Sequence, residues 1–265
     1  MITGIDHVVI GVRDLARAVG AFERIGFEIA PGGRHAGAGT ENALVRFSES
    51  FLELVALYDE REEREHGMGL GAVLAEREGF VGFALWSNDI HADARKLREA
   101  GMPVTGPMER SRDRADGRTI RWSGMVVGDE KRGLGALLWF SPLPFVIQWA
   151  GPVAGYEPAG AHPNGAIETA SVTVRAADPD DVVRALTRGF GLAVADGGVC
   201  CGPMRIRVVA GEPAGIESVD VAVKSIAGAR DALRARGASF REEKDRLGVA
   251  PGEACGCRLA FVARV

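Results

Sequence analysis

The stretch "GIDHVVIGVRDLARAVGAFERIG", residues 4–26, decides the fold. Its first half is rich in β-branched residues and is typical of a strand. Asp14 then stands where a helix N-cap belongs, apolar residues follow at helical spacing, and Gly26 is placed to end the helix. The stretch therefore predicts a strand that runs directly into a helix, and "FEIA", residues 27–30, begins the next strand.

The same pattern recurs three times along the chain. The later copies are "FVGFALWSNDIHADARKLREAG" at 80–101, "ASVTVRAADPDDVVRALTRG" at 170–189 and "SVDVAVKSIAGARDALRARG" at 218–237. The distance from cap to glycine is 12 residues in the first, second and fourth copies, where the caps are Asp14, Asp89 and Ser225. In the third copy Asp178 is the better cap and Gly189 the expected end. Four copies in register indicate an internal repeat.

Short β-like runs follow each helix, so each repeat is a βαβββ unit. Such a unit exposes one face of its sheet and must pair with another. We predict an α+β protein whose four units form paired, curved mixed sheets around a cleft. The first domain spans residues 1–150, with units at 1–60 and 78–150. A Gly- and Pro-rich linker covers 151–168, and a shorter, degenerate pair of units covers 169–265.

The bulk properties exclude several classes of protein. A net charge of −4 and a pI near 5.8 argue against nucleic-acid binding, which needs a basic face. No run approaches the roughly 20 apolar residues of a membrane span. The N-terminus has no signal-peptide pattern. We therefore expect a cytoplasmic protein whose partner is a small molecule.

Several stretches resemble the glyoxalase-like branch of the vicinal oxygen chelate superfamily, which also includes extradiol dioxygenases and bleomycin-resistance proteins. They are "IDHVVIGVRDL", "GGRHAGAGTENALVRF" followed by "FLELVAL", then "PFVIQWAG" and "HPNGA". The resemblance covers residues 1–170. It implies a small oxygenated substrate held in a cleft by a divalent metal (Zn, Fe, Mn, Ni or Mg). No nucleotide cofactor is expected.

The resemblance places ligands or catalytic groups at His7, on the first strand, and Glu53, within "FLELVAL". A buried carboxylate needs a partner, and a histidine or a metal would serve. The equivalent positions Gly82, Ala170 and Ser218 hold no histidine, and "GALLWF" at 135–140, the expected last strand of unit two, has no acid. Two protein ligands rarely hold a catalytic metal. Three interpretations stay open: a metal site, a metal-free His–Glu pair, and a structural His7.

Further polar residues are candidates for substrate binding. Gln148 and His162 could complete the site. His35 and Asn42 flank a glycine-rich turn that similar proteins place at the mouth of the cleft, although a solvent-exposed loop is an equal alternative. Arginine suits a carboxylate or phosphate. Of the five arginines in residues 110–121, we select Arg114 and Arg118, with Trp122 as the floor of the pocket.

Two functions remain open. One is an enzyme with isomerase, lyase or oxygenase chemistry on a small, anionic metabolite. The other is a non-catalytic small-molecule binder of the bleomycin-resistance type, which the ligands missing from units two to four favour. The second pair of units would then support the first pair or form a homodimer.

Overall fold

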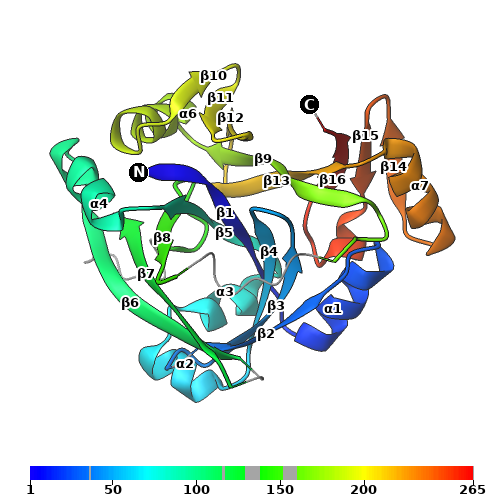
Figure 1. Cartoon of the computed structure of the whole chain (residues 1–265), viewed down its shortest axis with the longest axis horizontal. Coiled ribbons are helices and arrows are strands. Elements are labelled where there is room, and N and C mark those ends of the chain that lie inside the picture. Colours follow the sequence, from blue (N-terminus) through cyan, green and yellow to red (C-terminus); the bar gives the residue numbers. More distant parts are fainter. Residues whose placement is uncertain (36, 115–116, 129–137, 152–159, 265) are drawn as a thin grey trace.

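A computed structural model describes residues 1–35, 37–114, 117–128, 138–151 and 160–264 (Figure 1). The chain folds into four βαβββ units, which confirms the predicted repeat. Unit one contains β1 (Ile2–Gly11), α1 (Leu15–Arg24), β2 (Ala30–His35), β3 (Thr40–Arg46) and β4 (Phe51–Leu57). Two short helices, α2 (Glu60–His66) and α3 (Leu70–Glu76), connect it to unit two.

The remaining units repeat this order. Unit two contains β5 (Gly79–Ser87), α4 (Ile90–Glu99), β6 (Val104–Arg114), β7 (Thr119–Val127) and β8 (Phe145–Trp149). Unit three contains β9 (Ala166–Ala176), α6 (Pro179–Arg184), the π-helical turn η3 (Ala185–Gly189), β10 (Ala193–Ala195), β11 (Gly198–Cys201) and β12 (Met204–Ala210). Unit four contains β13 (Gly215–Val223), α7 (Ile226–Ala235), β14 (Phe240–Glu243), β15 (Arg246–Val249), η4 (Pro251–Ala254) and β16 (Leu259–Ala263).

The predicted N-caps are all confirmed. The side chains of Asp14, Asp89, Asp178 and Ser225 each accept a hydrogen bond from a backbone N–H in the first turn of the helix that follows. A side-chain acceptor at this position satisfies one of the free N–H groups of the helix. The caps therefore set the residue at which each helix begins after its strand.

The third helix ends later than predicted. Gly26, Gly101 and Gly237 have φ between 66° and 88° and end their helices as expected. Gly189 instead lies inside η3, and the residue with positive φ is Gly191, at 71°. A π-helical turn adds one residue to the helix. The extra residue of η3 accounts for a cap-to-glycine distance of 13 rather than 12 in this unit.

Units one and two close into a barrel with the strand order β1-β4-β3-β2-β6-β7-β8-β5. One seam is the antiparallel pair β1–β5, and the other is β2–β6, where His35 lies opposite Arg112. Units three and four form an open sheet of eight strands, β10-β11-β12-β9-β13-β16-β15-β14. Its end strands β10 and β14 have only 3 and 4 residues. Because these end strands are so short, β10 and β14 do not pair with each other as β2 and β6 do, and the second sheet stays open.

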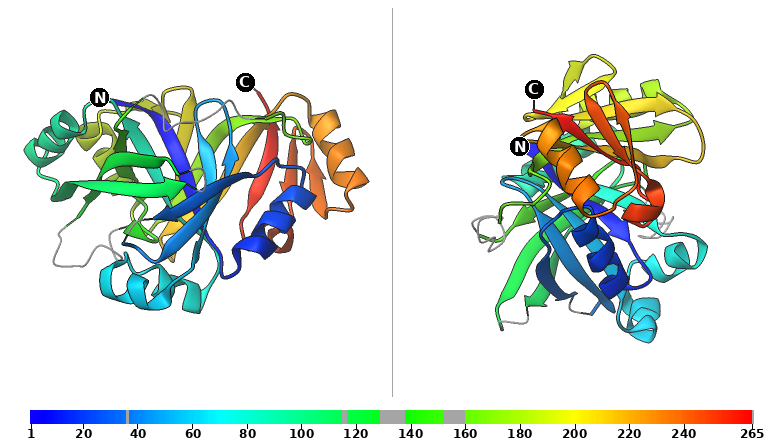
Figure 2. Two further views of the ribbon diagram at one scale, coloured as in Figure 1. Left: turned by 60° about the horizontal axis from the view of Figure 1, so that its bottom comes forward. Right: turned by 90° about the vertical axis from the view of Figure 1, so that its right-hand side faces the viewer.

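The two sheets share one large hydrophobic core. Figure 1 shows β9 and β13 of the open sheet lying across β1 and β5 of the barrel, and Figure 2 shows the same arrangement from two other sides. Buried residues from both halves, among them Phe22, Leu85, Val219 and Phe261, belong to this core. Each half therefore stabilises the other. None of the helices in the described ranges is long and apolar enough to cross a membrane.

Two predicted boundaries need correction. The linker was predicted at 151–168, but β9 already begins at Ala166; residues 152–159 lie outside the described part of the chain. The run "GALLWF" was predicted as the last strand of unit two. Its residues 135–137 lie outside the described ranges, and residues 138–140 are not in a strand. The last strand of unit two is β8, which pairs in parallel with β5 as β4 does with β1.

Candidate active site in the N-terminal barrel

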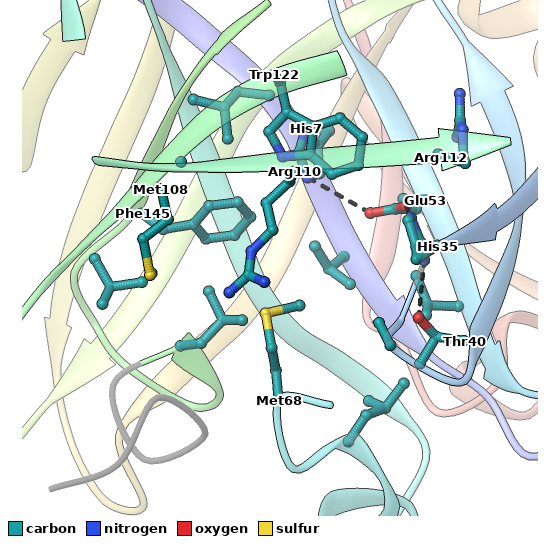
Figure 3. Close-up of a pocket in the computed structure, with 18 of the residues that line it drawn as sticks. His7, His35, Thr40, Glu53, Met68, Met108, Arg110, Arg112, Trp122 and Phe145 are labelled. Carbon is teal, nitrogen blue, oxygen red and sulfur yellow. Dashed lines mark hydrogen bonds and ion pairs between the residues drawn. The ribbon is translucent and has the colours of Figure 1, made fainter. Parts of the chain in front are cut away.

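The barrel encloses a cavity of about 130 Å³ that residues from both units line (Figure 3). Its wall is mainly apolar and aromatic, and its polar side chains come from only a few positions. Helix α3 and residues 138–139 pack against apolar side chains of β1, β4, β5 and β7. A concave, largely apolar pocket with a few convergent polar groups is the usual form of a small-molecule site.

His7 lies on β1 and is held in one orientation. Its Nδ1 atom is 2.7 Å from Oδ1 of Asp6, and its ring stacks on Phe51 at 4.5 Å between centroids. Neighbouring residues of a strand normally point to opposite faces. The pairing of β1 with β5 is shifted between Ile5 and His7, and such a bulge can re-aim a side chain. This irregularity lets Asp6 and His7 meet, and it leaves Nε2 of His7 directed at the cavity.

Glu53 faces His7 from β4, as predicted. Its Oε2 atom is 3.5 Å from Nε2 of His7, and its Oε1 atom is 3.5 Å from Nε2 of His35. Burial alone would raise the pKa of Glu53. The imidazole of His35, the charge of His7 and the amide of Asn42 outweigh burial and lower the pKa to about 2. Glu53 is therefore a buried carboxylate anion between two imidazoles.

Asn42 lies behind Glu53 and does not line the cavity. Its Nδ2 atom donates to Oε1 of Glu53, while its Oδ1 atom accepts from the backbone N–H of Gly33 at 2.9 Å and from Arg112 at 3.1 Å. The two donors at Oδ1 fix the amide so that its NH₂ group points at the carboxylate. Asn42 was predicted to bind substrate; the structure places it outside the cavity, in contact with Glu53.

His35 and Trp122 line the cavity, as predicted. His35 ends β2, and its Nδ1 atom is 2.8 Å from the hydroxyl of Thr40 across the glycine-rich turn. Its ring meets the edge of Trp122 at 6.1 Å between centroids. The turn therefore lies beside the pocket, as the resemblance implied.

The arginines at the pocket differ from those selected on sequence. Arg110 and Arg112 line the cavity, because residues 108, 110 and 112 of β6 share one face of the strand. Arg118 precedes β7, is exposed and does not line the cavity. The side chain of Arg114 lies outside the described part of the chain. Arg118, which the sequence analysis selected, lies beyond the cavity, near the tip of the β6–β7 hairpin.

Gln148 and His162 do not line the cavity either. Oε1 of Gln148 accepts a hydrogen bond from the backbone N–H of Ile90 at 2.7 Å, so this side chain caps α4. His162 is buried away from the pocket, where its Nδ1 accepts from the N–H of Glu28 and its Nε2 donates to the carbonyl of Arg46. Burial lowers the pKa of His162, in keeping with a neutral ring that joins two backbone segments. The structure thus places both side chains away from the cavity that they were predicted to line.

The residues present do not complete a metal site. Val9, two residues after His7, lies opposite Glu53 in the β1–β4 pair. In unit two, Ala84 is two residues after Gly82 and lies opposite Phe145. Gly82 and Phe145 thus take the places of His7 and Glu53, and neither offers a donor atom. Across the described ranges, no group of three His, Cys, Asp or Glu side chains is arranged to hold a metal.

The groups at the site that sequence reasoning missed include Asp6, Arg110, Arg112 and Phe145. Asp6 depends on the bulge in β1, which the sequence does not reveal. The two-residue spacing of Met108, Arg110 and Arg112 was visible, but it decides their direction only once β6 is known to be a strand of the barrel wall. Phe145 takes its place only through the pairing of β5 with β8.

Comparisons with solved structures show the same fold. A protein from Staphylococcus aureus described as hypothetical is 17% identical, with 98% of each chain covered and a TM-score of 0.70. The Mn(II)-bound glyoxalase of Novosphingobium aromaticivorans is 14% identical over 99% of this chain and 82% of that chain, with a TM-score of 0.65. A mutant of 4-hydroxymandelate synthase from Streptomyces coelicolor is 11% identical over 100% and 93%, with a TM-score of 0.61.

These similarities establish the vicinal oxygen chelate fold. A search of curated proteins finds no match. The model of the glyoxalase-like domain matches residues 5–190, which are more than two thirds of the chain and cover the barrel from Ile5 of β1 to the end of β8. The chain therefore belongs to the glyoxalase-like domain family.

Proposed function

We propose that the barrel cavity is the active site of an enzyme that moves a proton on a small, oxygenated, anionic metabolite. This is the chemistry of isomerases and lyases. The observation that carries the proposal is the placement of His7, whose Nδ1 is bound by Asp6 while Nε2 faces the cavity 3.5 Å from Glu53. A carboxylate that orients an imidazole and a reactive nitrogen open to the pocket are the parts of a general acid–base catalyst.

The lowered pKa of Glu53 decides how the roles divide. A general base works best when its pKa lies near the operating pH. The pKa of Glu53 is lowered to about 2, so this carboxylate is a poor proton acceptor near neutral pH. We therefore assign proton transfer to Nε2 of His7. Glu53 compensates the positive charge that forms on the imidazole when it takes up the proton.

No step of the proposal uses a metal. One structural neighbour is a Mn(II)-bound glyoxalase, but it shares only 14% identity with this chain. Glu53 lies 3.5 Å from both His7 and His35 in unit one, but these side chains are not arranged to hold a metal within the described ranges. The equivalent positions in unit two are Gly82 and Phe145. Three protein ligands are usual for a catalytic metal. The donor set therefore supports the metal-free His–Glu pair over the metal site that the resemblance implied.

The alternative function is a non-catalytic binder. The observation in its favour is the apolar surface around Phe145 of unit two, which meets the edge of His7 at 5.4 Å between centroids. Such a surface buries a ligand without reacting with it. Binding without turnover would distinguish this function from the enzyme.

The test is deuterium exchange measured by proton NMR. Purified protein is incubated in D₂O with a panel of small 2-oxo and 2-hydroxy acids, and loss of the signal of the C–H next to the carbonyl or carboxylate is followed. We expect the wild type to exchange at least one compound faster than buffer, and Glu53→Gln to be slower. Saturable binding with no exchange of any compound would leave the binder as the function.

A further inference from the structure

We propose that Arg110 receives the carboxylate of the substrate and that the tryptophan-lined wall receives an apolar arm, so that the pocket selects monocarboxylates with an aryl or alkyl side chain. This inference rests on the proposed function for the identity of the pocket. It goes beyond that function by naming the chemical class of the ligand and the residue that selects it.

Arg110 is a cation at the cavity without an internal partner. Its side chain makes no hydrogen bond or ion pair with any residue that the structure describes, and it lines the cavity. In Figure 3 the side chain reaches from β6 toward Met68. A guanidinium offers up to five N–H donors in a fork that matches a carboxylate. Its hydrogen-bonding capacity is therefore available to a ligand.

Arg112, two residues along the same strand, has a different role. It is buried, and its Nη1 atom donates to Oδ1 of Asn42 at 3.1 Å. Arg112 therefore acts on the catalytic pair through Asn42. The two arginines of the cavity therefore have separate tasks. Arg112 holds the side chain of Asn42 in place, and Arg110 faces the ligand.

The remaining wall of the cavity suits an apolar arm. The rings of Trp122 and Trp149 lie 5.4 Å apart between centroids at an angle of 56°, and both line the cavity. Met68 and Met108 also line it. Methionine adapts to the shape of its neighbours and makes favourable contacts with aromatic rings. An aryl or alkyl group would replace water against this wall and gain hydrophobic free energy.

The charges fix the orientation of such a ligand. Glu53 is a buried anion at the same cavity, so it repels a carboxylate, whereas Arg110 attracts one. In Figure 3 Glu53 lies with His7 and His35, and the guanidinium of Arg110 points away from this group. The carboxylate is thus drawn to Arg110, and another part of the ligand faces Nε2 of His7.

Calorimetric titration with four probes tests the inference: phenylacetate, hexanoate, phenylacetamide and acetate. Phenylacetamide keeps the ring but has no charge, and acetate keeps the charge but has no arm. We expect the wild type to bind phenylacetate and hexanoate at least about tenfold more tightly than the other two, since a hydrogen bond to a charged group contributes about 1.5–3 kcal/mol and tenfold corresponds to about 1.4 kcal/mol. Arg110→Gln should bind phenylacetate and phenylacetamide about equally.

The matched control is Arg121→Gln. Arg121 lies on β7 of the same hairpin, is exposed and does not line the cavity, so its variant should keep the preference of the wild type. The inference is overturned if Arg110→Gln keeps that preference, if Arg121→Gln loses it equally, or if none of the probes binds the wild type. Deuterium exchange is measured on the same variants. Loss of the acid preference without any exchange would contradict the proposed function alone, whereas exchange with an unchanged preference would contradict this inference alone.

Discussion

Nε2 of His7 and Oε2 of Glu53 face each other across 3.5 Å, and each side chain is held from behind by a second polar group. Asp6 binds Nδ1 of His7 and in turn accepts from the indole N–H of Trp149 at 2.8 Å. Asn42 donates to Glu53. These contacts form a row of polar side chains along one wall of a mainly apolar cavity. The distance between His7 and Glu53 at the centre of the row exceeds that of a normal hydrogen bond.

The lowered pKa of Glu53 predicts how stability depends on pH. Its folded-state pKa is about 2, below the ordinary value of 4.5 expected in the unfolded chain. The carboxylate therefore adds stability that is fully present above pH 4.5 and is lost as the pH falls toward 2. Between these limits the wild type should lose on the order of 3 kcal/mol that Glu53→Gln does not lose.

Urea unfolding of both proteins between pH 2 and pH 6 measures this difference. Glu49→Gln is the control, because Glu49 is exposed and its replacement should leave the pH dependence of the wild type intact. Parallel stability curves for the wild type and Glu53→Gln would mean that the carboxylate is not held as an anion in the folded protein.

Asn42→Ala tests whether the residue behind Glu53 positions it. The substitution removes the amide donor to Glu53 and the acceptor for Arg112. We expect the maximal rate of exchange to fall about tenfold, in line with the loss of one hydrogen bond to a charged group. Because Asn42 does not line the cavity, the substrate concentration at half-maximal rate should stay close to that of the wild type. An effect on that concentration alone would assign Asn42 to substrate binding.

Gly32 allows β2 to approach Asn42 closely. A Cβ atom at Gly32 would overlap the side-chain and backbone oxygens of Asn42. Gly32→Ala should therefore lower the free energy of unfolding by about 1–3 kcal/mol. Gly20, in the exposed part of α1, has no atom near its Cβ position, so Gly20→Ala should raise the free energy of unfolding by about 0.5–1 kcal/mol. Thermal unfolding of both variants checks that the midpoint temperature falls for Gly32→Ala and rises for Gly20→Ala. Equal shifts in the two midpoints would contradict the close approach of β2 to Asn42.

Gln148→Ala separates structure from catalysis. The variant loses the acceptor for the N–H of Ile90 at the start of α4, which should cost about 1 kcal/mol of stability. The side chain lies outside the cavity, so exchange by the folded variant should match that of the wild type. A variant that folds normally but no longer catalyses exchange would indicate that Gln148 binds the substrate.

The sequence was informative where the signal is local. Asp14, Asp89, Asp178 and Ser225 cap their helices as predicted, because a cap depends on a few neighbouring residues. The repeat of these caps predicted four βαβββ units and placed His7 and Glu53 on strands of the same unit. Their proximity followed because the first and last strands of a unit are neighbours in the sheet.

The sequence was uninformative where distant segments set the result. Arg110 and Arg118 lie in one hairpin, and only the seam between β2 and β6 shows which of them lines the barrel. Gln148 lies on β8 next to the start of α4, and its side chain caps that helix. The end strands β10 and β14 have 3 and 4 residues, at or below the shortest run of about 4 residues in which periodicity identifies a strand.

The most direct test of the account is the deuterium-exchange rate of His7→Asn. Asparagine can still donate to Asp6 in place of Nδ1 but has no atom at the position of Nε2. We predict that the variant binds the exchanging compound but exchanges it at least about 100-fold more slowly than the wild type, the usual contribution of a general acid–base group. Exchange at the wild-type rate in His7→Asn would contradict the assignment of proton transfer to His7.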